Sequence, residues 1–471
     1  MRRLIILSFL LFLFSATAYA ENFTMAGYLK NEFAIGLDTF NDIHKFKNIL
    51  KLSGEYRIDD EWTFFASTKY WYDLAYDWYE KYDSAQHYMG HVQRTEWLRD
   101  CYLDYTSDKL DIRLGKQQVV WGQADGIPIL DRVNPFNLTE FWLPDFVDLR
   151  IPLWMINIKY APKVDSILQL LIIPDFEQST VAPPDAPFTF RSYRLFENFK
   201  NWWEGPPNLD PLDPLFKPFV GTVTTNIYYP GKKFKNSTFG VQWLDRIADI
   251  EYTLNFLYGY YYSASTYTEP PTAPTNQNFS RRFKLWRLYA GSFNKTFTES
   301  GPLQGITLRG DFAYYNDEPT YFGIADRSSA GVNRWNNIFW LIGIDKFLAT
   351  NFLASFQFSQ YIMQEDSPGG FDNTGKPYDT LNRYTYGAQD EVENIFSLKL
   401  ATDFMHERLK PEVLWTWTDD NQGKVSPKVT YEIRDNLWLT TGWHYFYGNE
   451  GDSYGQFRDK NQIYLNLTYT F

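Results

Sequence analysis

The chain has 471 residues, a formal net charge of −12 and a pI near 5.0, which argues against a nucleic-acid-binding protein. Its one cysteine, Cys101, excludes an internal disulfide, and we interpret it as a small packed residue within a strand. Aromatic residues make up 19% of the chain while its mean hydropathy is −0.42, so apolar and polar surfaces alternate finely, as in a membrane barrel with a lipid-facing band and a polar lumen.

The first residues have the pattern of a secretory signal peptide. Two arginines precede an apolar run over residues 4–14, and residues 18–20, Ala-Tyr-Ala, supply a small-x-small cleavage site. The apolar run is too short for a membrane-spanning helix, which needs about 20 residues. We therefore predict a signal peptide at residues 1–20 and a single barrel domain at residues 21–471.

Apolar and polar residues then alternate with a period of two in about 18 segments, which predicts β-strands. The alternation is plain at residues 110–117 and 306–316, and weaker at residues 166–174, where leucines fall on both faces. The predicted strands lie at residues 23–33, 49–56, 62–72, 94–105, 110–117, 154–162, 166–174, 239–246, 250–262, 284–294, 306–316, 337–347, 352–360, 392–402, 409–418, 424–433, 437–447 and 461–471.

Short and long connections alternate between these strands. Short links such as residues 58–60 and 434–436 contrast with the long connections at residues 34–48, 73–93, 118–153, 175–238, 263–283, 317–336, 361–391 and 448–460. Outer-membrane barrels have short periplasmic turns, longer extracellular loops and an even number of strands. We therefore predict an all-β fold, a transmembrane antiparallel β-barrel of about 18 strands within a range of about 16 to 20, whose long extracellular loops fold partly into the lumen.

This architecture predicts a location in the outer membrane of a Gram-negative bacterium, with both termini in the periplasm. The last strand, residues 461–471, alternates strictly and places Tyr469 and Phe471 on one face with Leu465 and Leu467. A terminal Phe on such a strand resembles the signal that the barrel assembly machinery reads. Tyr469 and Phe471 are therefore the expected assembly signal, with that machinery and outer-membrane lipid as partners.

The connection at residues 118–153 is the richest in chemistry, being dense in Asp, Arg, Pro and Trp. So long a connection is uncommon in a compact domain unless it is functional or disordered, and its apolar content argues against disorder. We predict a structured loop that folds into the lumen and forms its constriction.

Short elements within residues 115–160 resemble a family signature. They are Gly115-Lys116-Gln117 at a strand end, Trp121-Gly122, Asp125-Gly126, Leu130-Asp131, Asn134-Pro135 and Arg150-Ile151-Pro152-Leu153-Trp154-Met155. These elements resemble those of the outer-membrane barrel family called domain of unknown function thirteen-oh-two. The resemblance implies a porin-like barrel, often considered a partner of inner-membrane transporters for hydrophobic or lipid-like molecules. In that family an acidic residue often follows the Trp-Gly pair, whereas this chain has Gln123.

Charges of both signs and aromatic rings are interleaved along the same loop. Paired charges can hold a loop against the wall of a wet lumen, whereas an unpaired desolvated charge is costly. Interleaved rings would offer an apolar track to an amphipathic solute. The loop therefore either braces the barrel or contacts a substrate. The candidate constriction or substrate-contact residues are Lys116, Gln117, Trp121, Asp125, Asp131, Arg132, Asn134, Trp142, Asp145, Asp148, Arg150 and Trp154.

A second long loop, at residues 175–238, is rich in proline, and residues 192–203 within it form a predicted short amphipathic helix. This helix could dip into the pore, cap it from outside or belong to a mobile surface loop. The sequence leaves these alternatives open.

Motifs for catalysis and for cofactors are not found in the sequence. It has no GxSxG, P-loop, HExxH or CxxCH pattern. His87 and His91 have a spacing that could hold a metal on a helix, but no third fixed ligand accompanies them. His444 shares parity with the residues predicted to face the lumen, which is unsuited to a lipid-face hydrolase. We therefore expect no enzyme activity, no cofactor and no metal site.

Two function classes remain. The first is an outer-membrane channel or transporter, passive or partner-driven, for small amphipathic or hydrophobic solutes. The second is a structural barrel that anchors or sheathes a periplasmic or extracellular partner, such as a lipid carrier or a cytochrome. A periplasmic carrier or an inner-membrane transporter is the partner that the first class would involve. The solute and the oligomeric state are not determined by the sequence.

Overall fold

The computed structural model describes residues 22–37, 42–78, 93–124, 126–183, 186–190, 223–269, 277–319, 334–364, 392–450 and 452–471. The predicted signal peptide and the predicted helix at residues 192–203 lie outside these ranges, as do Asp125, His87 and His91. Within the described ranges, no helix is long and apolar enough to cross a membrane.

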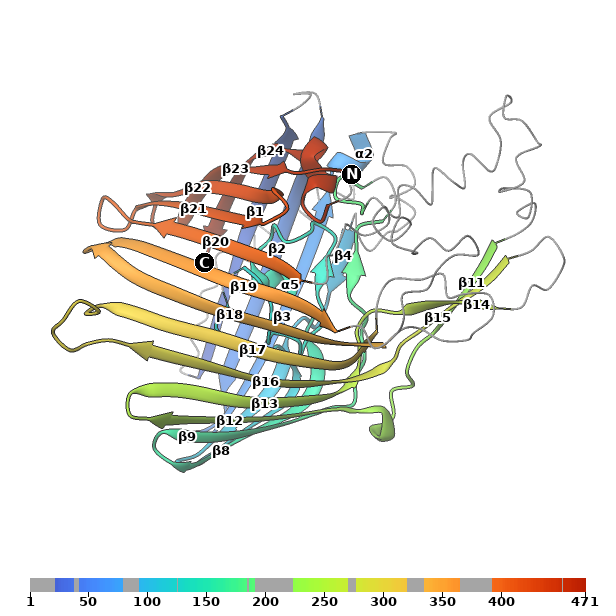
Figure 1. Cartoon of the computed structure of the whole chain (residues 1–471), viewed down its shortest axis with the longest axis vertical. Coiled ribbons are helices and arrows are strands. Elements are labelled where there is room, and N and C mark those ends of the chain that lie inside the picture. Colours follow the sequence, from blue (N-terminus) through green and yellow to red (C-terminus); the bar gives the residue numbers. More distant parts are fainter. Residues whose placement is uncertain are drawn as a thin grey trace.

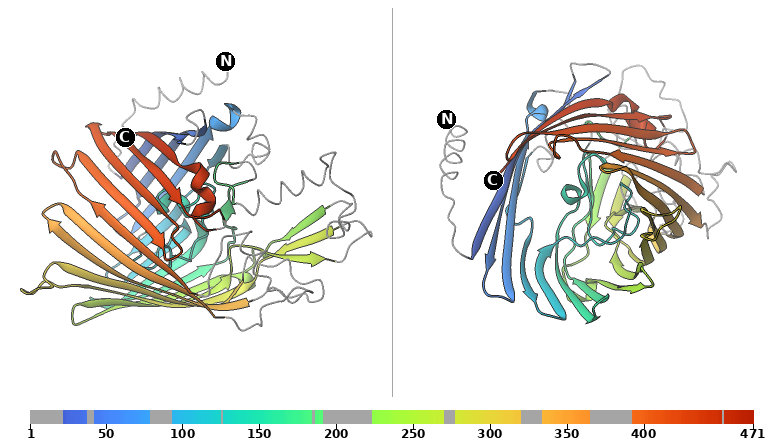
Figure 2. Two further views of the ribbon diagram at one scale, coloured as in Figure 1. Left: turned by 45° about the horizontal axis from the view of Figure 1, so that its top comes forward. Right: turned by 90° about the vertical axis from the view of Figure 1, so that its left-hand side faces the viewer.

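The wall is one antiparallel sheet that closes on itself, since every strand except β4 pairs with a neighbour on each side and β24 pairs with β1 (Figures 1 and 2). Its strands are β1 (Phe23–Gly36), β2 (Ile43–Arg57), β3 (Trp62–Asp73), β4 (Gln93–Glu96), β5 (Cys101–Thr106), β6 (Leu110–Gln117), β8 (Leu153–Lys163), β9 (Ser166–Ile173), β12 (Thr238–Ile247), β13 (Ile250–Tyr260), β16 (Leu285–Thr296), β17 (Ile306–Pro319), β18 (Arg334–Ala349), β19 (Phe352–Gln364), β20 (Val392–Ala401), β21 (Leu409–Thr418), β22 (Gly423–Arg434), β23 (Leu437–Tyr447) and β24 (Gln462–Thr470). Because β4 and β5 both pair with β3, they share one position, and the closed barrel has 18 strands. The predicted fold and strand number are confirmed.

The period-2 pattern decides which side chains face outward. On β24, Leu465 and Leu467 are exposed on the outer surface, while Asn466 and Thr468 between them are half-buried toward the lumen. This alternation is the one that lipid outside and water inside require. The last residue, Phe471, exchanges two backbone hydrogen bonds with Gly27 of β1, at 2.8 and 3.0 Å, and so completes the closure of the barrel.

One predicted strand is wrong in detail. Residues 94–105 were expected to form a continuous strand, but residues 97–100 leave the ladder between β4 and β5. Ser67 of β3 bridges the interruption, because its backbone accepts from Arg99 at 2.9 Å and its amide donates to Asp100 at 2.8 Å. The sequence pattern missed this bulge because alternation on both sides of it remains intact.

Several elements lie outside the wall, in segments that were predicted only as loops. β11 (Val223–Tyr228), β15 (Gln277–Arg282) and β14 (Ser265–Glu269) form a separate three-stranded sheet that stands away from the barrel (Figure 1). The remaining elements are α2 (Ala75–Trp78), α5 (Phe146–Leu149), η2 (Phe234–Asn236), η3 (Gly455–Lys460) and the short pair β7 (Asn137–Leu138) and β10 (Thr180–Val181).

Candidate functional site

The connection between β6 and β8 leaves the wall and folds into the barrel. The two strands stay paired up to Gln117 and Leu153, so residues 118–152 form the inward loop. Figure 2 shows this part of the chain inside the ring of strands when the barrel is viewed end on. The expected inward loop is therefore present, and its contacts define the site.

The first half of the inward loop is anchored by apolar packing on one side of the lumen. Trp121, Ile129 and Leu130 are at most 2% exposed and belong to one buried cluster with the wall. The wall residues of this cluster come mainly from β13, β16, β17 and β18, and they include Leu257, Trp286, Leu288, Tyr315, Phe339 and Leu341. Apolar side chains that would otherwise face water in the lumen are thereby buried against the loop.

Polar contacts hold the turn at residues 122–124 against β17. The Asp311 carboxylate accepts the backbone N–H groups of Gln123 and Ala124, at 3.0 and 3.1 Å. Arg309, two residues earlier on β17, donates to the carbonyl of Gln123. Gly122 has a φ of +97°, and a Cβ there would meet Leu130 and Asp311, so this close approach requires glycine.

Two tyrosines fasten the next turn of the inward loop to the same side. Tyr315 donates to the carbonyl of Ile129 and Tyr262 to the carbonyl of Val133, each at 2.7 Å. The guanidinium of Arg132 lies over the Tyr315 ring, 5.4 Å from its centroid, and its Nε is buried without a hydrogen-bond partner. Burial opposes ionisation of Arg132, but the nearby tyrosines and Glu318 outweigh it and raise the pKa of this side chain.

Asn134 joins the two ends of the inward loop. Its side chain accepts the N–H of Val119 at 2.8 Å and donates to the carbonyls of Ile151 and Gln117. A chain of side-chain hydrogen bonds continues along the wall from Gln117 through Asn157 and Gln169 to the indole of Trp121, each between 2.9 and 3.1 Å. Buried polar groups are thus satisfied, which makes the mouth of the loop rigid.

The second half of the loop is anchored by charge on the opposite side of the lumen. Glu140 forms ion pairs with Lys45 and with Lys47 of β2, the latter at 2.7 Å. Asp148 of α5 pairs with Lys69 of β3. The loop therefore spans the lumen from the β13 to β18 side to the β2 and β3 side.

A third set of contacts fixes the tip of the loop to the strands near the C-terminus. The backbone carbonyl of Trp142 accepts a hydrogen bond from Lys424 of β22 at 3.1 Å. Phe141, which has a left-handed φ of 51°, packs edge-on or tilted against Phe446 and Phe457. A strained non-glycine backbone persists only where surrounding contacts impose it, and here an aromatic cluster does so.

Within the loop, Arg150 pairs with Asp131 at 2.6 Å, and both side chains are buried. Burial raises the pKa of Asp131, and the hydrogen bond from Arg150 only partly opposes that rise. One carboxylate oxygen of Asp131 has no hydrogen-bond partner, which accounts for the cost of ionising it. This pair holds the two arms of the loop together rather than contacting the wall.

The two carboxylates that pair with wall residues, those of Glu140 and Asp148, have lowered pKa values, in contrast to Asp131. Burial disfavours the charged form of Glu140, but the attraction of Lys45 and Lys47 is stronger and lowers its pKa. In Asp148 burial is likewise outweighed, here by Lys69, and its pKa is also lowered. Both anchors are therefore ionised at neutral pH.

The pH dependence of loop anchoring follows from these two lowered pKa values. A depressed carboxyl pKa stabilises the docked state fully above the unfolded value of about 4 and loses that contribution as pH falls through the lower folded value. We expect the difference in limited proteolysis between the parent and Glu140→Gln to stay constant between about pH 5 and pH 8 and to disappear only below about pH 4, where Glu140 itself becomes protonated. A difference that disappears near pH 6 would contradict the lowered pKa of Glu140.

The family of the chain is decided by a family model described as Protein of unknown function (DUF1302), which matches residues 31–471. The chain belongs to this family. The resemblance found in the inward loop is thereby confirmed and extends over nearly the whole chain. A search of curated proteins found no match.

The solved structures that the chain resembles are outer-membrane porins. They include OccAB4 of Acinetobacter baumannii, with a TM-score of 0.51 and 10% identity over 96% of this chain and 98% of that one. OccAB2 of the same organism has a TM-score of 0.50 and 10% identity, over 97% and 99% of the two chains. At this identity the likeness concerns the fold alone, which is that of a porin-like outer-membrane barrel.

Two predicted lumen residues are wrongly placed. Lys116 and Trp154 face each other across β6 and β8 on the outer surface, on the same face as the exposed Leu114. Their parity opposes that of Gln117, which is buried toward the lumen. The signal was present in the sequence, since a one-residue step along a strand reverses the face.

The other candidates divide by role. Gln117, Trp121, Asn134, Asp131 and Arg150 are buried and serve the internal structure of the loop. Asp148 anchors it to the wall. The side chains of Arg132, Trp142 and Asp145 remain at least partly exposed in the lumen, and Asp145 forms no ion pair with a described residue.

The wall partners of the loop were missed. Lys45, Lys47, Lys69, Arg309 and Asp311 all lie on predicted strands or their extensions and share parity with lumen-facing neighbours. Charged residues on the inner face of a strand are the only sequence signal for them. By contrast, the lumen-side prediction for His444 is confirmed, since it stacks on Tyr464 and contacts Ser426 at 3.0 Å.

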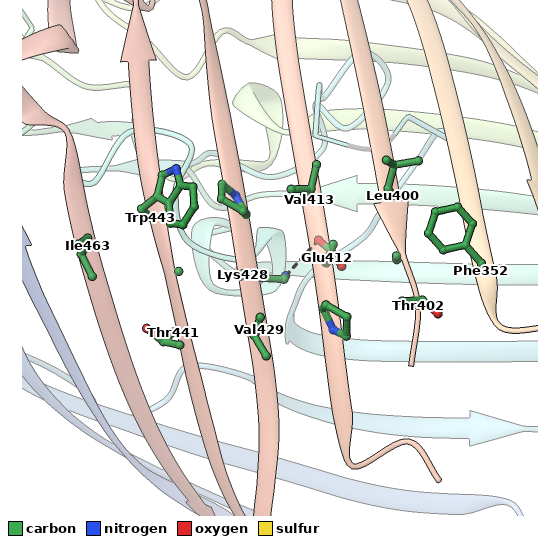
Figure 3. Close-up of a pocket in the computed structure, with 14 residues that line it drawn as sticks. Phe352, Leu400, Thr402, Glu412, Val413, Lys428, Val429, Thr441, Trp443 and Ile463 are labelled. Carbon is green, nitrogen blue, oxygen red and sulfur yellow. Dashed lines mark ion pairs between the residues drawn. The ribbon is translucent and has the colours of Figure 1, made fainter. Parts of the chain in front are cut away.

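A groove of about 410 Å³ lies elsewhere, on the outer face of β19 to β24 (Figure 3). It is lined mostly by outward apolar side chains, among them Val413, Val429 and Trp443. The ion pair between Lys428 and Glu412 at 3.2 Å lies beneath it. None of its lining residues belongs to the inward loop, so it is not part of the constriction.

Proposed function

We propose that this protein is an outer-membrane channel for small amphipathic solutes and that the inward loop is its constriction. The observation that carries the proposal is that residues 118–152 cross the lumen and are anchored on both sides. Asp311 and Tyr315 hold one side, and Lys45, Lys47 and Lys69 hold the other. A loop anchored on both sides narrows the wide lumen of an 18-strand barrel, and its anchors keep it from moving further across the pore.

The amphipathic character is inferred from the side chains that the anchoring leaves available. Trp142 and Phe146 are half-buried, with ring centroids 6.0 Å apart, and Asp145 between them is exposed. Arg132 supplies a half-buried cation on the other part of the loop. An apolar ring surface beside separate charges suits a solute that has both an apolar part and a polar head. Trp121 and Phe136, by contrast, are buried in the loop's own packing.

The channel proposal is tested by current across planar bilayers. Purified wild-type barrel should give discrete conductance steps, and short alkylammonium or alkyl sulfate ions should block them. Trp142→Ala should shorten blocker residence by about tenfold, the effect of losing about 1.4 kcal/mol. Trp443→Ala, which removes an equal ring from the outer surface, is the matched control and should change neither the steps nor the block.

Absence of steps in the wild type and in a variant without the loop would refute a channel. In that case the second candidate applies, a structural barrel that docks a periplasmic or extracellular partner. The three-stranded sheet of β11, β14 and β15 favours this class, because it stands away from the wall where another protein could contact it (Figure 1). Direct binding of a soluble extracellular protein to this sheet, without conductance, would be the expected observation, because the connections that carry β11, β14 and β15 would lie on the extracellular side.

The channel proposal includes a location and an orientation. The barrel would lie in the outer membrane, with Tyr469 and Phe471 read during assembly and both termini in the periplasm. Long connections such as residues 118–152 would then enter from the extracellular side. We propose no catalytic step. A periplasmic carrier or an inner-membrane transporter would give the otherwise passive flow of solute its direction.

A further inference from the structure

Strand pairing in the wall is incomplete where the inward loop leaves it. β4 pairs with β3, while β5 pairs with both β3 and β6. β6 ends at Gln117 and β8 begins at Leu153. Among the described strands, β4 therefore has a neighbour on one side only, and the ladder has a gap between β4 and β8.

The short helix α5 lies beside this gap and is held there by side chains, without forming strand pairs. Arg99, which is 4% exposed, donates to the carbonyl of Val147 at 2.8 Å and to that of Arg150 at 3.2 Å. Gln118 also donates to the carbonyl of Val147, at 3.3 Å. Asp148 pairs with Lys69 on the lumen side. Side-chain contacts thus replace the backbone ladder at this one position.

The gap is bordered by exposed apolar side chains. Lys116, on the outer face, donates to the carbonyl of Leu98 at 2.8 Å, which brings the bulge of residues 97–100 beside Trp154. Trp97 is 79% exposed and Val147 of α5 is 54% exposed. Leu98, Val120 and Trp154, in the segments next to the gap, are exposed as well.

The incomplete strand pairing at this position has a consequence in a membrane. A lipid phase offers no hydrogen bonds, so irregular backbone is tolerated only where protein or the interface satisfies it. Tryptophans gather at the membrane interface, which fits Trp97 and Trp154 beside the gap. Displacing α5 would break a few side-chain contacts, whereas parting two paired strands would break a whole ladder.

We propose that the gap between β4 and β8 is a side port, closed by α5, through which the apolar chain of an amphipathic solute passes between the lumen and the outer leaflet. The inference rests on the proposed channel function, because it specifies where such a solute leaves or enters the lumen. The inward loop then has two faces. Asp148 faces the charged lumen wall, and Val147 faces the bilayer.

The first test measures whether α5 reaches the bilayer and does not depend on conductance. A fluorophore is attached at Val147→Cys in a Cys101→Ser background, and the barrel is placed in phosphatidylcholine vesicles. Nitroxide-labelled lipid should quench it about as strongly as a label at Val429→Cys on the outer face. A label at Thr468→Cys, on the lumen face of β24, should respond to aqueous iodide instead. Quenching of the Val147 label by iodide alone would overturn the side port.

The second test locks the port. Gln118→Cys and Val147→Cys are joined by a short bis-methanethiosulfonate cross-linker, which a reductant removes, and each channel serves as its own control in one planar bilayer. Lysophosphatidylcholine in the bilayer should block the reduced form, with block weakened about tenfold in the cross-linked form. A matched pair, Val241→Cys and Phe256→Cys, lies opposite each other on the continuous ladder of β12 and β13 and should show no difference.

The outcomes separate the two proposals. Conductance steps with equal block before and after reduction would overturn the side port and leave the channel intact. No steps in any variant would refute the channel and, with it, this route for its solute, and the quenching measurement would then report only whether α5 reaches the bilayer. Block that appears only after reduction, together with quenching by lipid at Val147, supports both.

Discussion

Replacing residues 118–152 by an Asn-Gly turn is expected to produce a stable barrel with a several-fold larger single-channel conductance. The design is possible because β6 and β8 remain paired up to Gln117 and Leu153, and Asn-Gly closes a two-residue hairpin. The loop contacts both sides of the lumen, through an apolar cluster on one side and ion pairs on the other. Its removal therefore widens the path that the 18-strand wall encloses.

The deletion also exposes the wall residues that the loop covers. Leu288 and Tyr315 would face water, so the melting temperature should fall while the barrel remains folded. A control that shortens the turn at residues 298–305, at the opposite end of the barrel, should leave conductance unchanged. Equal conductance in the parent and in the loop-replaced barrel would refute the constriction.

Asp311→Ala is the second change with a large expected effect. The substitution leaves the N–H groups of Gln123 and Ala124 without their acceptor, and each buried unsatisfied group costs about 1–3 kcal/mol. We expect faster amide hydrogen exchange at both positions, by about tenfold or more, and greater open-channel noise as the turn moves.

The control for this prediction is Asp245→Ala on β12. Asp245 accepts from Ser166 at 2.7 Å and has no contact with the inward loop. It should alter stability locally without changing exchange at Gln123 or channel noise. If Asp311→Ala leaves both measurements unchanged, the turn is held by its apolar contacts, and the polar anchor is not needed.

Many features of the barrel were predictable from the sequence because they depend on local patterns. Strand positions follow from a period of two, as the matching bounds of Leu110–Gln117, Leu409–Thr418 and Leu437–Tyr447 show. Short turns and long loops follow from the spacing between those strands. The family resemblance likewise rested on elements within residues 115–160, and the match over residues 31–471 confirmed it.

Errors arose where neighbours in space decide the outcome. The bulge at residues 97–100 depends on Ser67, which lies on another strand. The outward placement of Lys116 and Trp154 could have been predicted, since Lys116 shares parity with Leu114 on β6 and Trp154 shares parity with Ile156 and Ile158 on β8.

The sequence by itself determined that residues 118–152 are a structured loop with charges and rings, since those properties reside in the segment. Only the tertiary structure decided that Glu140 meets Lys45 and that Asp311 meets Gln123. These partners are 95 and 188 positions apart in the chain, and barrel closure brings them together. It also decided that α5 lies beside the bulge of residues 97–100, where Arg99 and Gln118 donate to its backbone. A helix this short has no periodic signal in the sequence, so its position depends on the hydrogen-bond donors that neighbouring segments present to it.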